Sequence, residues 1–226
     1  MTEPILEVDD LVKRFGGLTA TDGVSVSFDD DELCAIIGPN GAGKSTFFNL
    51  IMGELRPTSG TVRFDEDITD LPPAGTVRRG LVKSFQTSNV FGDLTVFENV
   101  RLASQASGNP YNFWRRKETF EGPLRKAEAV LDEMDLSRKR DATAAELSHG
   151  EERSLEIAIA LATDPKMLLL DEPSSGMSPE ETREVIDVIR DLSTTIPVLL
   201  IEHKMSVVMG VADRIIVLHN GQVLAD

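Results

Sequence analysis

The chain is poor in the residues that build disulfide frameworks and membrane spans. Its 226 residues include one cysteine, one tryptophan and one tyrosine, and there are eight lysines against fifteen arginines. A single cysteine, Cys34, excludes an intramolecular disulfide and a cysteine metal site. No apolar run approaches the roughly 18 residues that a membrane-spanning helix needs, and no signal-peptide pattern opens the sequence. We therefore expect a soluble, cytoplasmic protein.

Basic residues are outnumbered by acidic ones. There are 38 Asp and Glu against 23 Lys and Arg, which gives a formal net charge of −15 at pH 7. Such a surface repels nucleic-acid phosphates, so DNA or RNA binding is disfavoured. Acidic, lysine-poor surfaces also suit concentrated salt, where ions screen the self-repulsion. We take this as an indication of a halophilic source, which concerns the habitat and not the chemistry.

The chain does carry a phosphate-binding loop. Residues 38–46 fit G-x-x-x-x-G-K-[ST], and they lie between an apolar run and a helical pattern, as the motif requires. Backbone N–H groups of such a loop, with the helix N-terminus, bind phosphate oxygens; a plain glycine-rich turn is the alternative. Lys44 would reach the β- and γ-phosphates, and the Ser45 hydroxyl would bind Mg²⁺. The candidate nucleotide-binding residues are Gly38, Pro39, Asn40, Gly41, Ala42, Gly43, Lys44, Ser45 and Thr46.

Polar residues follow three strand-like runs, of which the first two below are wholly apolar. Residues 167–170 lead to Asp171 and Glu172, residues 198–201 lead to Glu202 and His203, and residues 80–85 lead to Gln86. Charge at the end of a buried strand is costly, so Asp171 suits Mg²⁺ and Glu172 suits general-base catalysis on water. The strand ends of an open α/β sheet share one crevice, where His203 and Gln86 could contact phosphate, metal or water. Considered without the other motifs, a single histidine such as His203 is more often structural, and a glutamine such as Gln86 is more often a plain surface amide.

Two further features bear on a site. Ser148 and Glu151 have the spacing of a capping box before a helix that ends at Asp164-Pro165, and the Ser148 hydroxyl with the Gly150 amide could bind an anion. Phe15 precedes the Gly16-Gly17 turn; it is either a core residue or a ring that stacks on a base, and the residues alone favour the core.

The remaining patterns give the outline of the fold. Strands are expected at 5–12, 24–28 and 61–64, with turns at Gly16-Gly17 and Asp22-Gly23 and a hairpin at Asn220-Gly221. Helices are expected at 94–107, 124–134, 179–192 and 205–211. Residues 87–150 read as a helical insertion, and the aromatic–basic stretch 113–116 is either a folded-back loop or a contact for a partner or membrane surface.

These motifs, in this order, resemble the ATP-binding subunit of an ABC transporter. The resemblance covers nearly the whole chain: residues 38–46 match Walker A, Gln86 the Q-loop, residues 147–151 the signature, residues 168–172 Walker B with the catalytic Glu, residues 175–178 the D-loop and His203 the switch histidine. It implies an α/β fold, namely a P-loop NTPase (RecA-like) core with an N-terminal antiparallel β subdomain and an inserted α-helical subdomain. Within one domain, 1–226, it assigns 1–86 and 163–226 to the core and about 87–162 to the helical subdomain.

The resemblance also implies a mechanism with ATP and Mg²⁺. Two subunits, identical or paralogous, pair head to tail, so that Ser148, Gly150 and Glu151 of one chain face the γ-phosphate bound by Lys44 of the other. Glu172 would polarise the attacking water, His203 would hold the γ-phosphate, and Phe15 would stack on adenine, which now favours that role. Dimer closure would act through Gln86 on membrane permease subunits at the cytoplasmic face of the membrane, and indirectly on a solute-binding protein.

Residues 85–91, 113–116 and 154–158 are similar to the branched-chain amino-acid importer subgroup, which includes urea and short-amide importers. This chain departs from the family at His149, where a glycine is usual, at Glu151, where Gln is common, and at 177–178, where an Asp is common. The sequence stops about one helix before members of that subgroup usually do. We expect either a trimmed chain or an abbreviated member of the subgroup. Lipid or polysaccharide export, a soluble repair or translation ATPase, and a non-hydrolysing ATP binder are alternatives; the retained Lys44 and Glu172 oppose the last.

Overall fold

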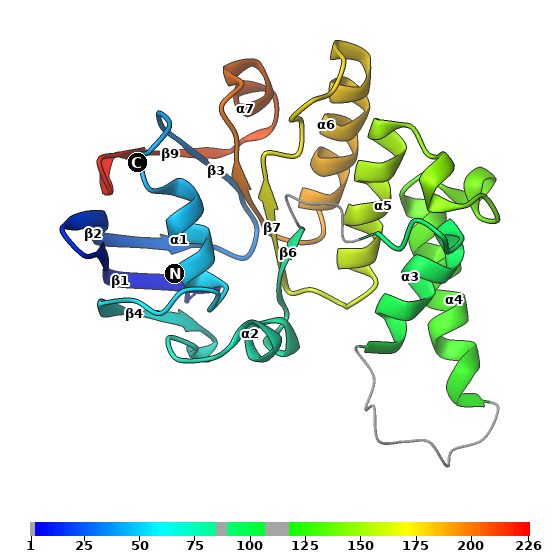
Figure 1. The fold of residues 1–226 in the computed structure, drawn as a ribbon, viewed down its shortest axis with the longest axis horizontal. Coiled ribbons are helices and arrows are strands. Elements are labelled where there is room, and N and C mark those ends of the chain that lie inside the picture. The colour runs from blue at the N-terminus through cyan, green and yellow to red at the C-terminus, as the bar shows by residue number, and fades with distance from the viewer. Residues whose placement is uncertain (1–2, 85–89, 107–117) are drawn as a thin grey trace.

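The structure is a computed structural model that describes residues 3–84, 90–106 and 118–226 (Figure 1). Its strands are β1 (Leu6–Phe15), β2 (Leu18–Phe28), β3 (Leu33–Ile37), β4 (Ser59–Phe64), β5 (Glu66–Asp67), β6 (Leu81–Ser84), β7 (Met167–Asp171), β8 (Val198–Ile201), β9 (Arg214–His219) and β10 (Gln222–Ala225). Its helices are α1 (Lys44–Ile51), α2 (Pro73–Arg79), α3 (Val96–Ala106), α4 (Glu118–Glu133), α5 (His149–Leu161), α6 (Pro179–Ser193) and α7 (Met205–Val211), with 3-10 turns at Ser137–Lys139 and Ala144–Glu146.

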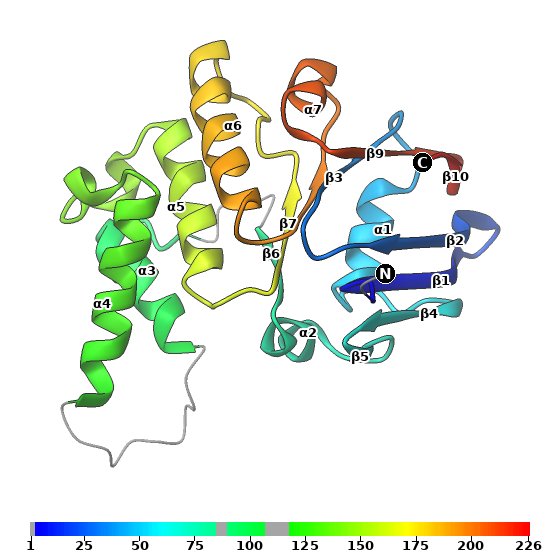
Figure 2. The same cartoon turned by 180° about the vertical axis from the view of Figure 1, so that it is seen from behind.

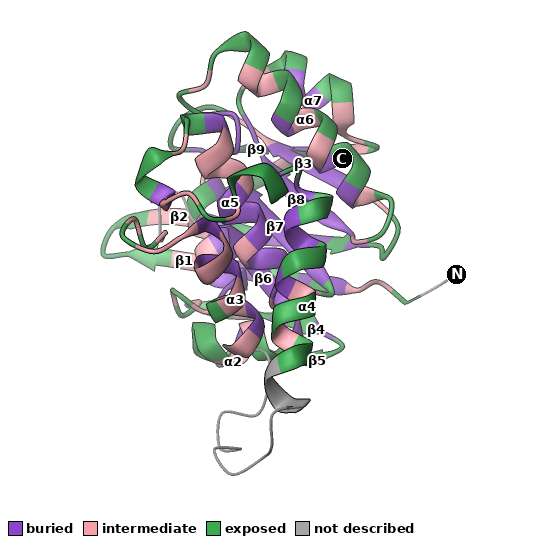
Figure 3. Cartoon of the chain, turned by 90° about the vertical axis from the view of Figure 1, so that its right-hand side faces the viewer, coloured by how far each residue is buried: buried purple, intermediate pink, exposed green. Residues whose placement is uncertain are grey.

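The larger sheet has the order β10-β9-β3-β8-β7-β6 among the described residues. Strands β3, β7 and β8 are apolar runs that are buried almost throughout, because helices and the smaller sheet cover both faces (Figure 3). The strands from β9 to β6 pair in parallel, and β10 turns back at the expected Asn220-Gly221 hairpin. The register places Ile36, Ile201 and Asp171 side by side. The residues that follow these three positions therefore leave the sheet at the same edge.

The smaller sheet is antiparallel and has the order β2-β1-β4-β5. Strands β1 and β2 form a hairpin that turns at Gly16-Gly17, as the sequence predicts. The prediction that Asp22-Gly23 forms a turn is wrong, because both residues lie within β2. Gly23 has a φ of 69° where the pairing with β1 shifts register, so the glycine makes a β-bulge inside one long strand.

Two apolar cores lie on the two faces of the larger sheet. One core joins α1, through Phe47 and Phe48, to the smaller sheet and to one face of the larger sheet. The other joins the opposite face to α5, α6 and the α3–α4 pair. Figures 1 and 2 accordingly show α1 between the two sheets, and α5 and α6 beyond β7 with α3 and α4 outermost.

The helical predictions hold with shifted ends. Helix α4 begins at Glu118, ahead of the expected 124, and contains Pro123. Ser148 and Ser178 cap helices α5 and α6 with complete capping boxes, and the Ser148 box is the one that the sequence predicts. The expected fold class is confirmed, since a P-loop core carries an antiparallel β sheet and an inserted group of helices. In the part of the chain that the structure describes, no helix is long and apolar enough to cross a bilayer.

Gly60 in β4 is fixed by close backbone packing. Its φ is 90°, and a Cβ there would lie 2.3 Å from the Asp10 carbonyl oxygen. We expect Gly60→Ala to lower the free energy of unfolding by roughly 2 kcal/mol or more, measured by urea denaturation. Gly122→Ala in α4 is the matched control: its Cβ would meet no atom within 4 Å, and alanine favours a helix. Equal effects of the two substitutions would contradict this account.

Candidate active site

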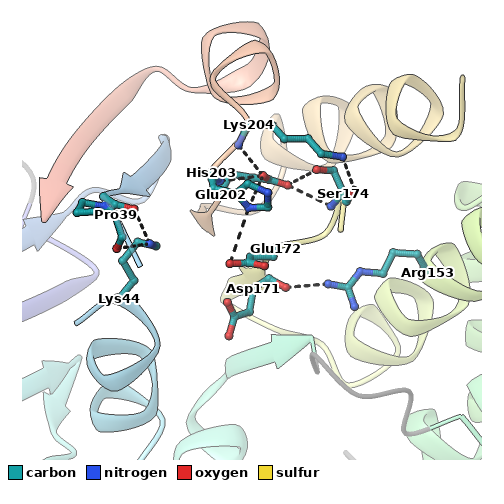
Figure 4. Close-up of polar contacts among 10 residues, drawn as sticks. Pro39, Lys44, Arg153, Asp171, Glu172, Ser174, Glu202, His203 and Lys204 are labelled. Carbon is teal, nitrogen blue, oxygen red and sulfur yellow. Dashed lines mark hydrogen bonds and ion pairs between the residues drawn. The ribbon is translucent and has the colours of Figure 1, made fainter. Parts of the chain in front are cut away.

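The phosphate-binding loop leads from β3 into α1 through left-handed glycines. Gly43 has a φ of 102°, and a Cβ on it would lie 2.4 Å from the Ala20 carbonyl oxygen, so the loop packs directly on β2. Lys44 begins α1 and is buried; its ammonium donates to the carbonyl oxygens of Gly38 at 2.6 Å and Pro39 at 3.2 Å (Figure 4). A cation and helix N–H groups thus meet at one point, which is suited to phosphate.

A hollow of about 440 Å³ lies over this loop. Its walls are residues 40–46 of the loop, residues 15 and 18–20 of the β1–β2 hairpin, and Glu172. Phe15 is 46% exposed and lines the hollow, so the preference for a core position that its residue type gave is wrong. The Lys13 ammonium lies 5.1 Å from the centre of its ring. The hollow therefore combines a phosphate cradle with an exposed aromatic ring, which is the pairing that a nucleotide requires.

Asp171 is a buried carboxylate without hydrogen bonds. It ends β7 with 1% exposure, and neither of its carboxyl oxygens has a hydrogen-bond partner in the described structure. Burial raises the pKa of this carboxyl, while the Lys83 ammonium, 3.8 Å from Oδ2, opposes the shift. Lys83 is itself 8% exposed and is held by the Asn49 side chain at 3.0 Å. Such an orphaned carboxylate fits the inner or water-mediated shell of a divalent cation.

Glu172 has the left-handed backbone, with a φ of 48°, that costs a non-glycine residue about 1–2 kcal/mol. Its amide donates to the Ile201 carbonyl at 2.9 Å, and its carboxylate lies 3.8 Å from Nδ1 of His203. Backbone strain of this kind gathers at functional sites. Figure 4 shows Glu172 and His203 facing each other across from Lys44. The expected meeting of the two strand ends is thus present.

At the start of α5, where the sequence analysis expects an anion site, the donors already have partners within the chain. The Ser148 hydroxyl accepts from the Glu151 amide at 3.3 Å, and the Gly150 amide donates to Oε1 of Glu181 at 3.3 Å. Donation from the Ser148 amide lowers the pKa of Glu151, and donation from the Ser178 amide lowers the pKa of Glu181. Helix α5 starts on the far side of β7 from α1 (Figure 1). Ser148 and Gly150 are not among the residues that line the hollow.

Three site features escaped the sequence analysis. Lys83 directly follows the apolar pair Leu81-Val82 in β6, a position at which a lysine could have marked a paired buried cation. Arg153 of α5 has a side chain that is 11% exposed and donates to the Asp171 carbonyl at 2.9 Å, which joins the signature helix to β7. Glu181 in the first turn of α6 accepts from the Gly150 amide, a contact between two helices that the sequence does not indicate. Gln86 and the 113–116 stretch lie outside the described residues.

The comparisons with known proteins agree with this geometry. The family model for the ABC transporter matches residues 21–175. The chain is 39% identical to the high-affinity branched-chain amino acid transport ATP-binding protein BraF of Pseudomonas aeruginosa, over 100% of this chain and 92% of BraF. It is 38% identical to LivG of Escherichia coli K12, over 100% and 92%, and 37% identical to the probable LivG of Methanocaldococcus jannaschii, over 100% and 90%. The chain belongs to the ABC transporter ATP-binding family.

Solved structures of the family have the same fold. The ATP-binding cassette MJ1267 of an ABC transporter, in its ADP conformation, matches with a TM-score of 0.87 and 37% identity, over 99% of this chain and 91% of that one. A dimeric cassette, MJ0796, in a post-hydrolysis state with ADP and Pi, matches with a TM-score of 0.79 and 26% identity, over 97% of both chains. The protein is thus an ATPase of the ABC class.

The buried Lys83–Asp171 pair should control the stability of the nucleotide-free chain. Lys83→Met leaves the Asp171 charge without its neighbouring cation and should lower the free energy of unfolding at pH 7 by about 3 kcal/mol. Removing the lysine raises the pKa of Asp171 in the folded state further. A group whose pKa is higher in the folded than in the unfolded state stabilises the fold at low pH, and this contribution is lost as pH rises through the folded-state pKa. The deficit should therefore be largest at neutral pH and shrink toward pH 4, measured by urea denaturation at each pH.

Lys166→Met is the matched control, since it removes the exposed Lys166–Asp65 pair, in which the side chains are 57% and 59% exposed. Such a pair contributes at most about 1 kcal/mol. A pH-independent deficit in Lys83→Met, or one no larger than that of the control, would rule out the buried ion pair as its cause.

Proposed function

We propose that this subunit powers import through an ABC transporter by closing as a dimer around two ATP molecules, and that the imported solutes are branched-chain amino acids or related small molecules. The observation that carries this proposal is the division of the site. The phosphate-binding loop, Phe15 and Glu172 line one hollow, while the Ser148–Gly150 face belongs to a helix beyond β7. One chain thus carries the two groups of residues that an ATP site needs, but the Ser148–Gly150 group does not line the hollow that the phosphate-binding loop forms.

The residues of the hollow bind the nucleotide in this proposal. Phe15 stacks on adenine at one end, and the loop N–H groups hold the phosphates at the other. The Lys44 ammonium exchanges the Gly38 and Pro39 carbonyls for phosphate oxygens, which carry more charge. Because all these groups belong to one chain, ATP binding does not require a partner.

Asp171, the Ser45 hydroxyl and Gln86 would hold Mg²⁺. The fit rests on Asp171, whose two buried oxygens lack donors and suit a cation that prefers carboxylate and hydroxyl oxygen. When bound, Mg²⁺ neutralises charge on the β- and γ-phosphates. Lys83 supplies a compensating charge on the side of Asp171 that faces β6.

Glu172 and His203 handle water and phosphate in this proposal. The Glu172 carboxylate accepts the proton of a water that attacks the γ-phosphate, and its left-handed backbone turns it out of the β7 line into the hollow. His203 donates a hydrogen bond to the γ-phosphate from beside that carboxylate. The second subunit completes the site with Ser148, Gly150 and Glu151, and its Gly150 amide must exchange the Glu181 carboxylate for that phosphate.

Transport follows from coupling this closure to membrane subunits. We propose that the chain lies at the cytoplasmic face of the membrane, held by permeases that receive solute from a binding protein, and that residues 87–162 form the helical subdomain that contacts them. The names of BraF and LivG support the solute class. The acidic, lysine-poor composition supports a role in concentrated salt.

Glu172→Gln tests the general base. The amide cannot accept the proton, so steady-state phosphate release should fall by about a hundredfold or more, and an ATP-bound dimer should accumulate in size-exclusion chromatography. Glu184→Gln, an exposed change on α6, should keep the original rate. Unchanged turnover in Glu172→Gln would refute the assignment of Glu172.

Ser148→Arg tests whether the α5 face acts on the partner. A bulky cation there should prevent closure and hydrolysis, while the affinity of the monomer for a fluorescent ATP analogue stays the same. Ser137→Arg, an exposed serine in the first 3-10 turn, is the control for an added arginine. Loss of ATP binding by the isolated Ser148→Arg subunit would mean that this face acts within one chain, contrary to the dimer model.

A further inference from the structure

Glu202 is a buried carboxylate that the proposed hydrolysis step does not use. It directly follows β8 and has 0% exposure. A carboxylate removed from water is destabilising by several kcal/mol unless hydrogen bonds or opposite charges replace its hydration. The groups around Glu202 therefore show what this acid holds in place.

Four donors converge on its two oxygens (Figure 4). Oε1 accepts from the Ser174 hydroxyl and from the Ser174 amide at 3.1 Å. Oε2 accepts from the amides of His203 at 3.0 Å and Lys204 at 3.3 Å. The Lys204 ammonium donates to the Ser174 carbonyl at 2.8 Å and closes the ring. One side chain thus joins the chain after β7 to the chain after β8.

The two joined segments carry the reacting pair. Ser174 lies two residues after Glu172, and His203 directly follows Glu202. The His203 side chain is 49% exposed, and its Nδ1 lies 3.8 Å from the Glu172 carboxylate. The Glu172 amide also bonds to the Ile201 carbonyl at 2.9 Å, so the Glu172 turn is fastened to the end of β8 on both sides. The orientation of the His203 side chain therefore depends on the backbone that Glu202 holds in place.

We propose that Glu202 is a positioning residue for ATP hydrolysis, which locks the His203 backbone to the Glu172–Ser174 turn so that the His203 side chain stays facing the Glu172 carboxylate. The inference rests on the function proposed above for Glu172 and His203. Glu202 touches no substrate and transfers no proton. It acts through the hydrogen bonds that hold the backbone, and its Oε2 also lies 3.9 Å from Nδ1 of His203.

The donor set explains why this position needs an acid. All four contacts are N–H or O–H donors, and only a carboxylate offers acceptors on both oxygens. In Glu202→Gln the shape is preserved, but the amide NH₂ must face either Ser174 or the two backbone amides, donor against donor. The variant therefore loses the hydrogen bonds either to Ser174 or to the amides of His203 and Lys204, while the side-chain volume stays nearly constant.

The test is a double-mutant cycle on ATP hydrolysis by the purified 226-residue chain. Glu202→Gln should lower kcat by about tenfold to a hundredfold, with KM and ATP affinity within about twofold, since misplacement of a reacting group by about 1 Å has effects of that size. His203→Ala should also lower kcat. In the double variant, Glu202→Gln should add less than about a twofold further loss, because it acts through His203.

Glu32→Gln is the matched control. Glu32 lies just before β3, at the opposite end of the sheet, and its largely buried carboxylate accepts the Asp29 amide at 3.1 Å and pairs with Arg214 at 3.2 Å. This variant should lose stability without a change in kcat. Ser174→Ala, which removes one donor and keeps the carboxylate, should show a smaller loss in kcat alone, and it replaces Glu202→Gln in the cycle if that variant does not fold.

Losses that multiply in the double variant, or a fall in thermal stability with kcat unchanged, would overturn the role of Glu202. If His203→Ala lowers kcat while Glu202→Gln keeps the original kcat, only the positioning role of Glu202 is overturned, and the proposed role of His203 stands. A wild-type rate in His203→Ala instead overturns the proposed role of His203, and the positioning role with it.

Discussion

The backbone pairing of three parallel strands determines where the chemistry takes place. In the register of β3, β8 and β7, Ile36, Ile201 and Asp171 are neighbours, and adjacent strands lie about 4.8 Å apart. The next residues along the chain are the phosphate-binding loop, Glu202–His203 and Glu172. A shift of one residue in either pairing would turn each side chain to the other face and separate these groups. The meeting of the phosphate-binding loop, Glu172 and His203 depends on this register.

The same edge concentrates features that are unfavourable for folding. Asp171 is buried without hydrogen bonds, Lys83 is buried beside it, Glu202 is fully buried, and Glu172 has a left-handed backbone. Each of these is destabilising by itself, and the apolar cores on both sides of the sheet offset them. Elements that break local folding rules gather where a protein acts. The buried charges and the left-handed Glu172 thus lie at the same edge as the motifs.

Sequence reasoning found the groups that depend on local pattern. The strand–loop–helix around Lys44, the cap at Ser148 and the polar ends of β7 and β8 follow from periodicity and capping chemistry, which are short-range. It failed where a distant partner decides the outcome. Gly23 was read as a turn because glycine permits one, whereas pairing with β1 makes it a bulge. Phe15 was read as core because of its type, whereas the hairpin places its ring at the hollow. The partners of Lys83, Arg153 and Glu181 lie far away in the sequence, so local pattern does not identify these contacts.

Glu181 changes what the start of α5 means. A free helix N-terminus would simply attract a phosphate, but the Gly150 amide already donates to a carboxylate from α6. In the proposed dimer the γ-phosphate must replace that carboxylate, so only the difference between the two interactions favours closure. That difference is smaller than the gross strength of a phosphate contact, because Glu181 loses a partner when the phosphate gains one. The proposed two-chain ATP site would therefore close by exchange of anions and open again when the phosphate leaves.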